Sequence, residues 1–176
     1  GGVRDVSDAV HVAERIAATP HGVIVCGGVA TRAGAATAGD DLADAVARLA
    51  HGAGWPVLAE PTSGLRCGVH DRSCVVAHYD VLLRDEGWAD AHLPRLAIRL
   101  GDTPTSKPLR AWLARTEQVV LDPDLAWHEP TRTAQWIAAA DPFCSVSRPS
   151  HITAVRNARF VDGSGRRNND SSLPLA

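Results

Sequence analysis

The chain has 176 residues, of which 45% are hydrophobic and 22% charged, and its formal net charge is −2. This length and apolar content suit one globular domain with a sizeable core, and they exclude a disordered chain and a strongly basic nucleic-acid binder. No apolar run approaches the roughly 20 residues that span a bilayer, and the first ten residues contain no apolar signal core, so we expect a cytoplasmic protein that binds neither membrane nor nucleic acid.

Amphipathic stretches and short apolar runs alternate along most of the chain. Apolar residues at helical spacing predict helices at 5–18, 40–51, 73–84, 105–115 and 131–140. Short apolar runs between them predict buried strands at 23–26, 56–59, 96–100 and 118–121. We expect Asp40 or Asp41 to cap the second helix, and Gly52 and Gly54 to end it. The alternation predicts an α/β fold, in which a parallel sheet has crossover helices on both faces.

The last part of the chain differs from the rest in pattern and charge. Residues 145–176 carry five arginines against two aspartates, a net charge of +3, which leaves −5 on residues 1–144. We therefore expect a single α/β domain over 1–144 and an irregular basic tail over 145–176, which is disordered or not native to the protein. The opening glycine indicates a processed chain or a piece of a longer one.

Metal and disulfide frameworks find little support in the sequence. The four cysteines (Cys26, Cys67, Cys74 and Cys144) form no CxxC pair, and the eight histidines show no HxxxH or HExxH spacing. We expect reduced, mostly buried thiols and no metal site.

The ends of the predicted strands are where a ligand of this fold class would bind. The stretch 27–32 lacks the GxGxxG spacing of a dinucleotide loop, and Glu60, which follows the second strand, runs straight into a proline. In 101–107, Ser106 stands where a Walker loop needs its second glycine. No GxSxG elbow and no carboxylate pair suited to acid–base chemistry are present. These patterns weigh against a nucleotide site.

Positively charged side chains do follow several of the predicted strands. Arg32, Arg66 and Lys107 each follow a predicted strand by a short loop, and Lys107 is the only lysine in the chain. Lys107 also lies near the start of a predicted helix, where backbone N–H groups favour anions. Together these side chains would suit a carboxylate-rich ligand, with ordinary surface charge as the alternative.

Four stretches resemble one enzyme family. They are WPVLAEPTSGLR (55–66), HYDVLLR (78–84), RLGDTPTSKPLRAWL (99–113) and VVLDPDLAWHEPTRTA (119–134). Their order and content are similar to the central domain of the 2-succinyl-5-enolpyruvyl-6-hydroxy-3-cyclohexene-1-carboxylate synthases, the MenD family of menaquinone biosynthesis. The likeness runs from about Gly22 to Asp141. The bias toward alanine and arginine indicates an actinobacterial member.

The resemblance implies a fold and an activity. The fold is the middle domain of thiamine-diphosphate enzymes, a Rossmann-like parallel sheet of about six strands that has lost nucleotide binding. Full-length members, which we expect to be homo-oligomers, decarboxylate 2-oxoglutarate on thiamine diphosphate and Mg²⁺ and add the succinyl unit to isochorismate. The flanking domains that supply the catalytic groups are missing here, so we expect a fragment with no catalytic residue, cofactor or metal of its own.

The resemblance also assigns roles to particular residues. The lysine of the family's SK segment reaches the acidic substrate, and Lys107 matches it, with Ser106 and Arg66 as further candidates for the same pocket. Pro108 stands where some members carry an arginine. One alternative is a regulatory module that binds an acidic aromatic effector, such as the pathway's dihydroxynaphthoate product, through Arg32, Arg66 and Arg99. Another is a nucleotide-binding oxidoreductase domain.

Overall fold

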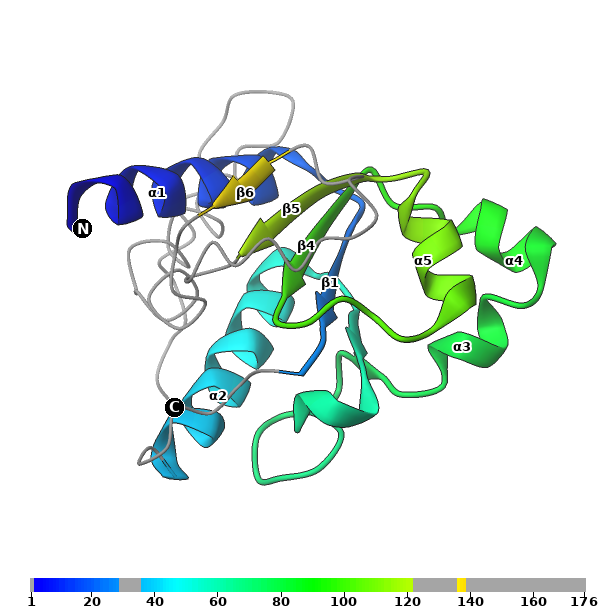
Figure 1. The fold of residues 1–176 in the computed structure, drawn as a ribbon, viewed down its shortest axis with the longest axis horizontal. Coiled ribbons are helices and arrows are strands. Elements are labelled where there is room, and N and C mark those ends of the chain that lie inside the picture. The colour runs from blue at the N-terminus through cyan, green and yellow to red at the C-terminus, as the bar shows by residue number, and fades with distance from the viewer. Residues whose placement is uncertain (1, 29–35, 122–135, 139–176) are drawn as a thin grey trace, which may run out of the picture.

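The structure is a computed structural model, and it describes residues 2–28, 36–121 and 136–138. Its centre is a sheet of six parallel strands in the order β3-β2-β1-β4-β5-β6 (Figure 1). The strands are β1 (Gly22–Cys26), β2 (Val57–Ala59), β3 (Val75–Val76), β4 (Leu96–Leu100), β5 (Glu117–Leu121) and β6 (Trp136–Ala138). This confirms the α/β class and the Rossmann-like sheet, and all four strands predicted from the sequence pattern are present. The predicted tail, 145–176, lies outside the described residues.

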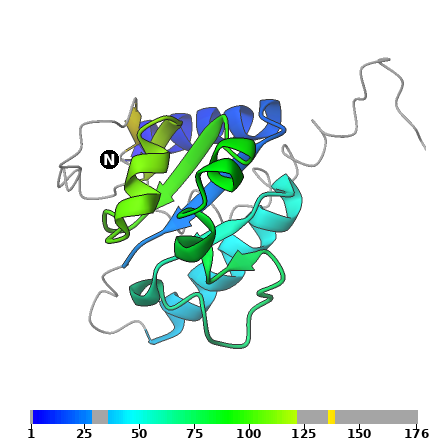
Figure 2. The ribbon, with the colours of Figure 1, turned by 90° about the vertical axis from the view of Figure 1, so that its right-hand side faces the viewer.

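Helices cover both faces of the sheet (Figures 1 and 2). They are α1 (Gly2–Ala18), α2 (Ala36–Ala53), α3 (Tyr79–Leu82), α4 (Glu86–Ala91) and α5 (Lys107–Leu113), with a single 3₁₀ turn, η1 (Pro61–Ser63). Buried residues of α1 and α2 pack on one face, and those of α3, α4 and α5 pack on the other. Because the sheet is covered on both faces, its central strands are apolar throughout rather than alternating.

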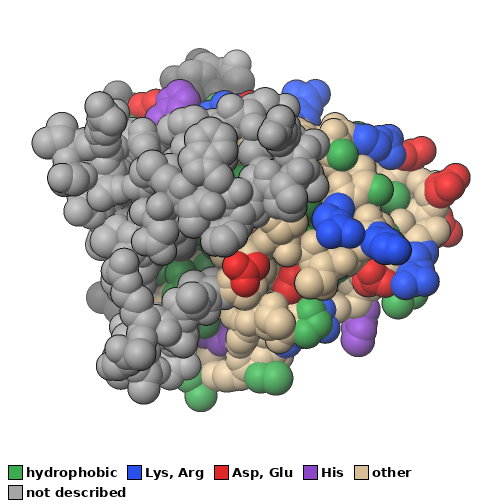
Figure 3. Space-filling view, in the orientation of Figure 1, with side chains coloured by type: hydrophobic (Ala, Val, Ile, Leu, Met, Phe, Trp, Pro, Cys, Tyr) green, Lys and Arg blue, Asp and Glu red, His purple; other side chains and the backbone are tan. Residues whose placement is uncertain are grey.

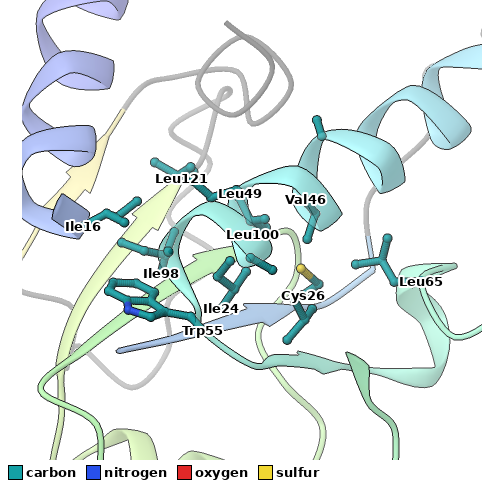
Figure 4. Close-up of a cluster of buried hydrophobic side chains, with 14 of the residues drawn as sticks. Ile16, Ile24, Cys26, Val46, Leu49, Trp55, Leu65, Ile98, Leu100 and Leu121 are labelled. Atoms are coloured by element: carbon teal, nitrogen blue, oxygen red, sulfur yellow. The ribbon is translucent and has the colours of Figure 1, made fainter. Parts of the chain in front are cut away.

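Successive strand residues divide between two hydrophobic cores. Ile24 and Cys26 of β1 point into the core beneath α1 and α2, where Ile98 of β4 joins them (Figure 4). Val23 and Val25 point to the opposite side, into the core beneath α3, α4 and α5. This division follows from the period of two in a strand, which sends neighbouring side chains to opposite faces. The two cores together hold the central strands from both faces of the sheet.

The second helix begins earlier than its sequence predicts. It starts at Ala36, so Asp40 and Asp41 lie inside it and neither is its N-cap, which corrects the prediction. The expected end is close to the observed one. The helix continues through Gly52 to Ala53, and Gly54 follows with a φ of 61°, a left-handed conformation that glycine adopts without steric cost.

The predicted helix at 73–84 is wrong over its first half. Val75 and Val76 form the edge strand β3, paired with Val57 and Leu58 of β2. Only the four residues of α3 are helical there, and α4, which the sequence analysis missed, follows with Asp85 as its N-cap. A pair of β-branched residues next to a free sheet edge gains more from strand pairing than from a helical turn.

The predicted helix at 131–140 is also wrong where the structure describes it. Residues 136–138 form strand β6, which pairs with Val119, Val120 and Leu121 of β5. The run of alanines in this segment favoured a helix, but the hydrogen bonds offered by the edge of β5 determine the local structure.

Three of the four cysteines lie in the described part of the chain. Cys26, Cys67 and Cys74 are free; Cys26 is buried, Cys74 half-buried and Cys67 exposed, so the expectation of mostly buried thiols is met by only one of these three. Burial raises the pKa of the Cys26 thiol far above its ordinary value.

Within the described residues, no helix has the length and apolar content needed to cross a membrane.

The loops that follow β1 and β4 are in direct backbone contact. Gly27 N donates to Leu100 O at 2.8 Å, and Asp102 N donates to Gly28 O at 2.8 Å. A Cβ atom on Gly27 would overlap the carbonyl oxygen of Asp102. These two strands flank the point where the strand order reverses, which is where doubly wound folds bind nucleotides. The two strands therefore stay paired into the first residues of the loops that follow them.

We predict that Gly27→Ala destabilises the domain, because the added methyl group must displace backbone rather than a side chain. The expected loss in free energy of unfolding is about 1–3 kcal/mol, measured by urea denaturation. Gly87→Ala is the matched control, since its Cβ would meet only the side chain of Asp85, at 3.4 Å. An unchanged stability for Gly27→Ala would show that the two loops are not packed as described.

Candidate site at the carboxyl edge of the sheet

The buried carboxylate of Glu60 joins the segments that follow three strands. Glu60 comes directly after β2 and is only 2% exposed. Its Oε2 accepts hydrogen bonds from the backbone N–H of Thr105 at 3.1 Å and from the Thr105 hydroxyl at 2.6 Å. Its Oε1 accepts a hydrogen bond from the buried hydroxyl of Tyr79. Thr105 belongs to the loop after β4, and Tyr79 opens α3 after β3, so one side chain ties the three segments together.

These contacts keep Glu60 ionised. Burial alone would raise the pKa of its carboxyl group, but the hydrogen bonds from Thr105 and Tyr79 and the charge of Arg66 outweigh burial and hold the pKa below its usual value. The same pairing works in the opposite direction on Tyr79. Burial, the hydrogen bond to Glu60 and the negative charge of Glu60 together raise the pKa of the phenol, so Tyr79 stays a donor.

Arg66 lies over the ring of Tyr79. Its Nε donates to the carbonyl oxygen of Ala59 at 2.8 Å, and its guanidinium carbon lies 5.9 Å from the centre of the Tyr79 ring. Gly64, with a φ of 74°, allows the chain to turn back between Glu60 and Arg66. The sequence analysis proposed Arg66 as a ligand contact; the structure places it beside the Glu60 carboxylate at the sheet edge.

A second carboxylate holds the start of α5. Asp80 Oδ1 accepts a hydrogen bond from the Ser106 hydroxyl at 2.6 Å, while Ser106 Oγ caps the helix by accepting from Leu109 N at 3.2 Å. Asp80 Oδ2 pairs with Arg84, one helical turn further on, at 3.0 Å. The hydrogen bond from Ser106 and the pair with Arg84 lower the pKa of Asp80. The Ser106 hydroxyl proton is thus used inside the protein.

Lys107 follows these two anchored residues. It is the first residue of α5 and is exposed, and no hydrogen bond or ion pair joins its side chain to any part of the chain that the structure describes. Lys and Arg side chains gather over α3 and α5 on this face of the molecule (Figure 3). The structure therefore combines an anchored backbone with an ammonium group that is available to a ligand.

In the described part of the chain, the arginines of the effector hypothesis do not form an exposed group comparable to Lys107. Arg99 is only 4% exposed on β4, where it bonds with Gln118 at 3.2 Å and Thr103 at 3.3 Å. A guanidinium so deeply covered does not present its charge at the surface. Arg32 lies outside the described residues, and Arg66 is the one member of the three that the structure places at the edge.

A Ser-His-Asp group on the surface is not a catalytic triad. Asp71 Oδ2 lies 2.7 Å and Ser73 Oγ 3.1 Å from the same ring nitrogen, Nε2 of His51, whereas a triad uses the two nitrogens for different partners. Hydrogen bonds from Ser73 and then His51 lower the pKa of Asp71 to about 2. The group ties the loop before β3 to the end of α2.

The described residues contain no cluster of side chains that could hold a metal ion. Among residues 2–28, 36–121 and 136–138, no three or more His, Cys, Asp and Glu side chains come together to hold a metal ion. Three of the roughly four acceptor positions of the buried Glu60 carboxylate are already used by Thr105 and Tyr79.

Lys107, Ser106 and Arg66 were predicted from the sequence, whereas Glu60, Tyr79 and Thr105 were not. These three residues lie within the stretches that resemble the synthase family, but neither the spacing nor the resemblance assigned them a role. One signal was available: an acidic residue placed directly after a buried strand needs partners, since an unpaired buried charge is very costly.

Comparisons with known proteins point to one kind of enzyme. The chain is 35% identical over 141 residues to a 2-succinyl-5-enolpyruvyl-6-hydroxy-3-cyclohexene-1-carboxylate synthase of Bacillus velezensis, covering 78% of this chain and 23% of the relative. It is 39% identical over 131 residues to the synthase of Geobacillus kaustophilus, covering 73% and 21%. It is 47% identical over 102 residues to the synthase of Halobacterium salinarum, covering 56% of this chain and 17% of the relative. No protein-family model matches the chain.

These identities support a domain similar to part of the MenD synthases. The aligned region is only about a fifth of the length of the curated relatives it matches, which is consistent with a domain of a larger enzyme. The relatives named above come from bacilli and a haloarchaeon, and they give no support to the predicted actinobacterial source.

We predict that Glu60→Gln lowers the free energy of unfolding more at pH 7 than at pH 3. The pKa of Glu60 in the folded protein is below its usual 4.5, so the charged carboxylate stabilises the fold above that pH and loses this contribution as the pH falls through the folded value. The expected loss at pH 7 is about 1–3 kcal/mol. The measurement is urea denaturation of both proteins at both pH values. An equal loss at the two values would show that the charge of Glu60 contributes nothing.

Proposed function

We propose that this chain is the central domain of a menaquinone-pathway synthase that joins a succinyl unit derived from 2-oxoglutarate to isochorismate. In this proposal the domain is a scaffold and part of the substrate wall, and Lys107 contacts a carboxylate of the acidic substrate. The observation that carries the proposal is the exposed ammonium of Lys107 on an anchored backbone, at the edge of the sheet where ligands bind in this fold class. The named relatives support the reaction.

The chemistry of Lys107 suits such a contact. An ammonium group is a compact charge with three donors on a flexible stem, so it can follow a carboxylate that changes position during a reaction. Ser106 and Arg66 stay candidates for the same pocket. Ser106 already donates to Asp80, and Arg66 Nε already donates to Ala59, so Lys107 has the most to offer a ligand.

The cofactors of the proposed enzyme do not fit the described residues. Thiamine diphosphate would supply the carbanion chemistry and Mg²⁺ would hold its diphosphate, but no group of metal-ligating side chains is assembled in the described part of the chain. We therefore assign cofactor binding, catalysis and subunit assembly to flanking domains of a cytoplasmic homo-oligomer, and we assign this chain no catalytic residue.

The two alternative functions fit the geometry less well. A regulatory site built on Arg32, Arg66 and Arg99 would need Arg99 at the surface, and it is buried. A nucleotide-binding oxidoreductase domain would need a glycine-rich loop of GxGxxG spacing after β1, which residues 27–32 lack.

A domain exchange tests the proposal. Residues 22–141 replace the aligned segment of the Bacillus velezensis synthase, and the chimaera is assayed for synthase activity with thiamine diphosphate and Mg²⁺. We predict an active chimaera in which Lys107→Ala raises KM for the acidic acceptor by about tenfold or more, because a charge-assisted contact worth roughly 1.5–3 kcal/mol is lost.

Arg115→Ala is the matched control, since Arg115 is an exposed cation that follows the far end of α5 and pairs with Asp90. A folded, assembled chimaera without activity would contradict the assignment to this synthase. An active chimaera with an unchanged KM in Lys107→Ala would contradict the role of the lysine.

A further inference from the structure

We propose that Glu60 is a positioning residue for Lys107: its buried carboxylate fixes the backbone from which the lysine side chain reaches out. This inference rests on the proposed function for the ligand of Lys107, but the positioning itself can be measured without any ligand.

The first support is the place where Glu60 bonds. Its Oε2 holds both the N–H and the hydroxyl of Thr105, which precedes Lys107 by two residues. Thr105 itself lies in a segment without helix or strand pairing, so no regular ladder holds its N–H. Without the carboxylate this segment would have the freedom of an ordinary loop.

The second support is that Glu60 is itself held to the centre of the sheet. Glu60 follows β2 directly, its own N–H donates to Cys26 O of β1 at 2.8 Å, and its other oxygen is held by the buried Tyr79 hydroxyl. The carboxylate is therefore attached to the centre of the sheet rather than to another loop. An interaction that links a loop to the sheet in this way transmits the position of the sheet to the loop.

The third support is the contrast between the two consecutive anchors and the residue after them. Thr105 is bonded to Glu60 and Ser106 to Asp80, whereas Lys107 is exposed and has no described partner. Asp80 is half-buried and pairs with Arg84. Glu60 is only 2% exposed, so it is the more deeply covered of the two anchoring carboxylates.

The single lysine makes the test direct. Labelling the chain with ¹⁵N-lysine gives one backbone amide signal, that of Lys107, and its relaxation reports order on the picosecond–nanosecond scale. We expect an order parameter of about 0.85 in the unchanged protein and below about 0.7 in Thr105→Val and Glu60→Ala. Thr105→Ser keeps the hydroxyl and should restore the original value.

Thr116→Val is the matched control, because it is the same change at a buried threonine beyond the other end of α5. It should leave the order of Lys107 unchanged even if it lowers stability. Thermal denaturation of every variant separates loss of order from loss of the fold. If Glu60→Ala does not fold, Thr105→Val decides the question.

A titration with succinate, followed by the side-chain signal of ¹³C-labelled Lys107, gives the second readout. We expect Thr105→Val to weaken succinate binding by about fivefold relative to both the unchanged chain and Thr116→Val. An order parameter that stays near 0.85 in Thr105→Val and Glu60→Ala would overturn the positioning role. Loss of order in these variants, with no succinate effect on the unchanged chain, would uphold the positioning role and contradict the proposed ligand instead.

Discussion

The burial of one carboxylate, that of Glu60, is the constraint on which the edge of the sheet depends. A buried charge is stable only when its hydrogen bonds are complete, and here Thr105 and Tyr79 complete them. The loop after β4 and the start of α3 must therefore lie against Glu60, because leaving the carboxylate unpaired would cost several kcal/mol. The segment before α5 is thus held by Glu60 through Thr105, and Asp80 adds a second anchor through Ser106.

The fold class is one that elsewhere binds nucleotides at the point where the strand order reverses. Both cores and the strand order β3-β2-β1-β4-β5-β6 are those of a doubly wound sheet. In the described residues, polar contacts at the carboxyl edge gather after β2 and β4, around Glu60. A fold defines where a site can be, and the residues at the strand ends decide which site is built.

Apolar runs predicted the central strands well, since β1, β2, β4 and β5 are short, buried and bounded by turns. The edge strands β3 and β6 were predicted as helices, because a pairing partner far away in the chain determines an edge strand and local pattern does not contain it. Lys107 and Arg66 were found through their place after predicted strands, and Ser106 through a family resemblance. Glu60, Tyr79 and Thr105 are separated by as many as 45 residues and meet only in the folded chain, so no spacing rule could have joined them.

Hydrogen exchange of the Thr105 amide tests this account most directly. The amide lies outside any helix or strand, and its described acceptor is the Glu60 carboxylate at 3.1 Å. If Glu60 holds the edge together, this amide opens only when the sheet opens, and its protection should approach that of central strand amides such as Ile98. Exchange at the rate of an exposed loop amide, with Ile98 still protected, would show that the carboxylate does not fix the segment and would contradict the account.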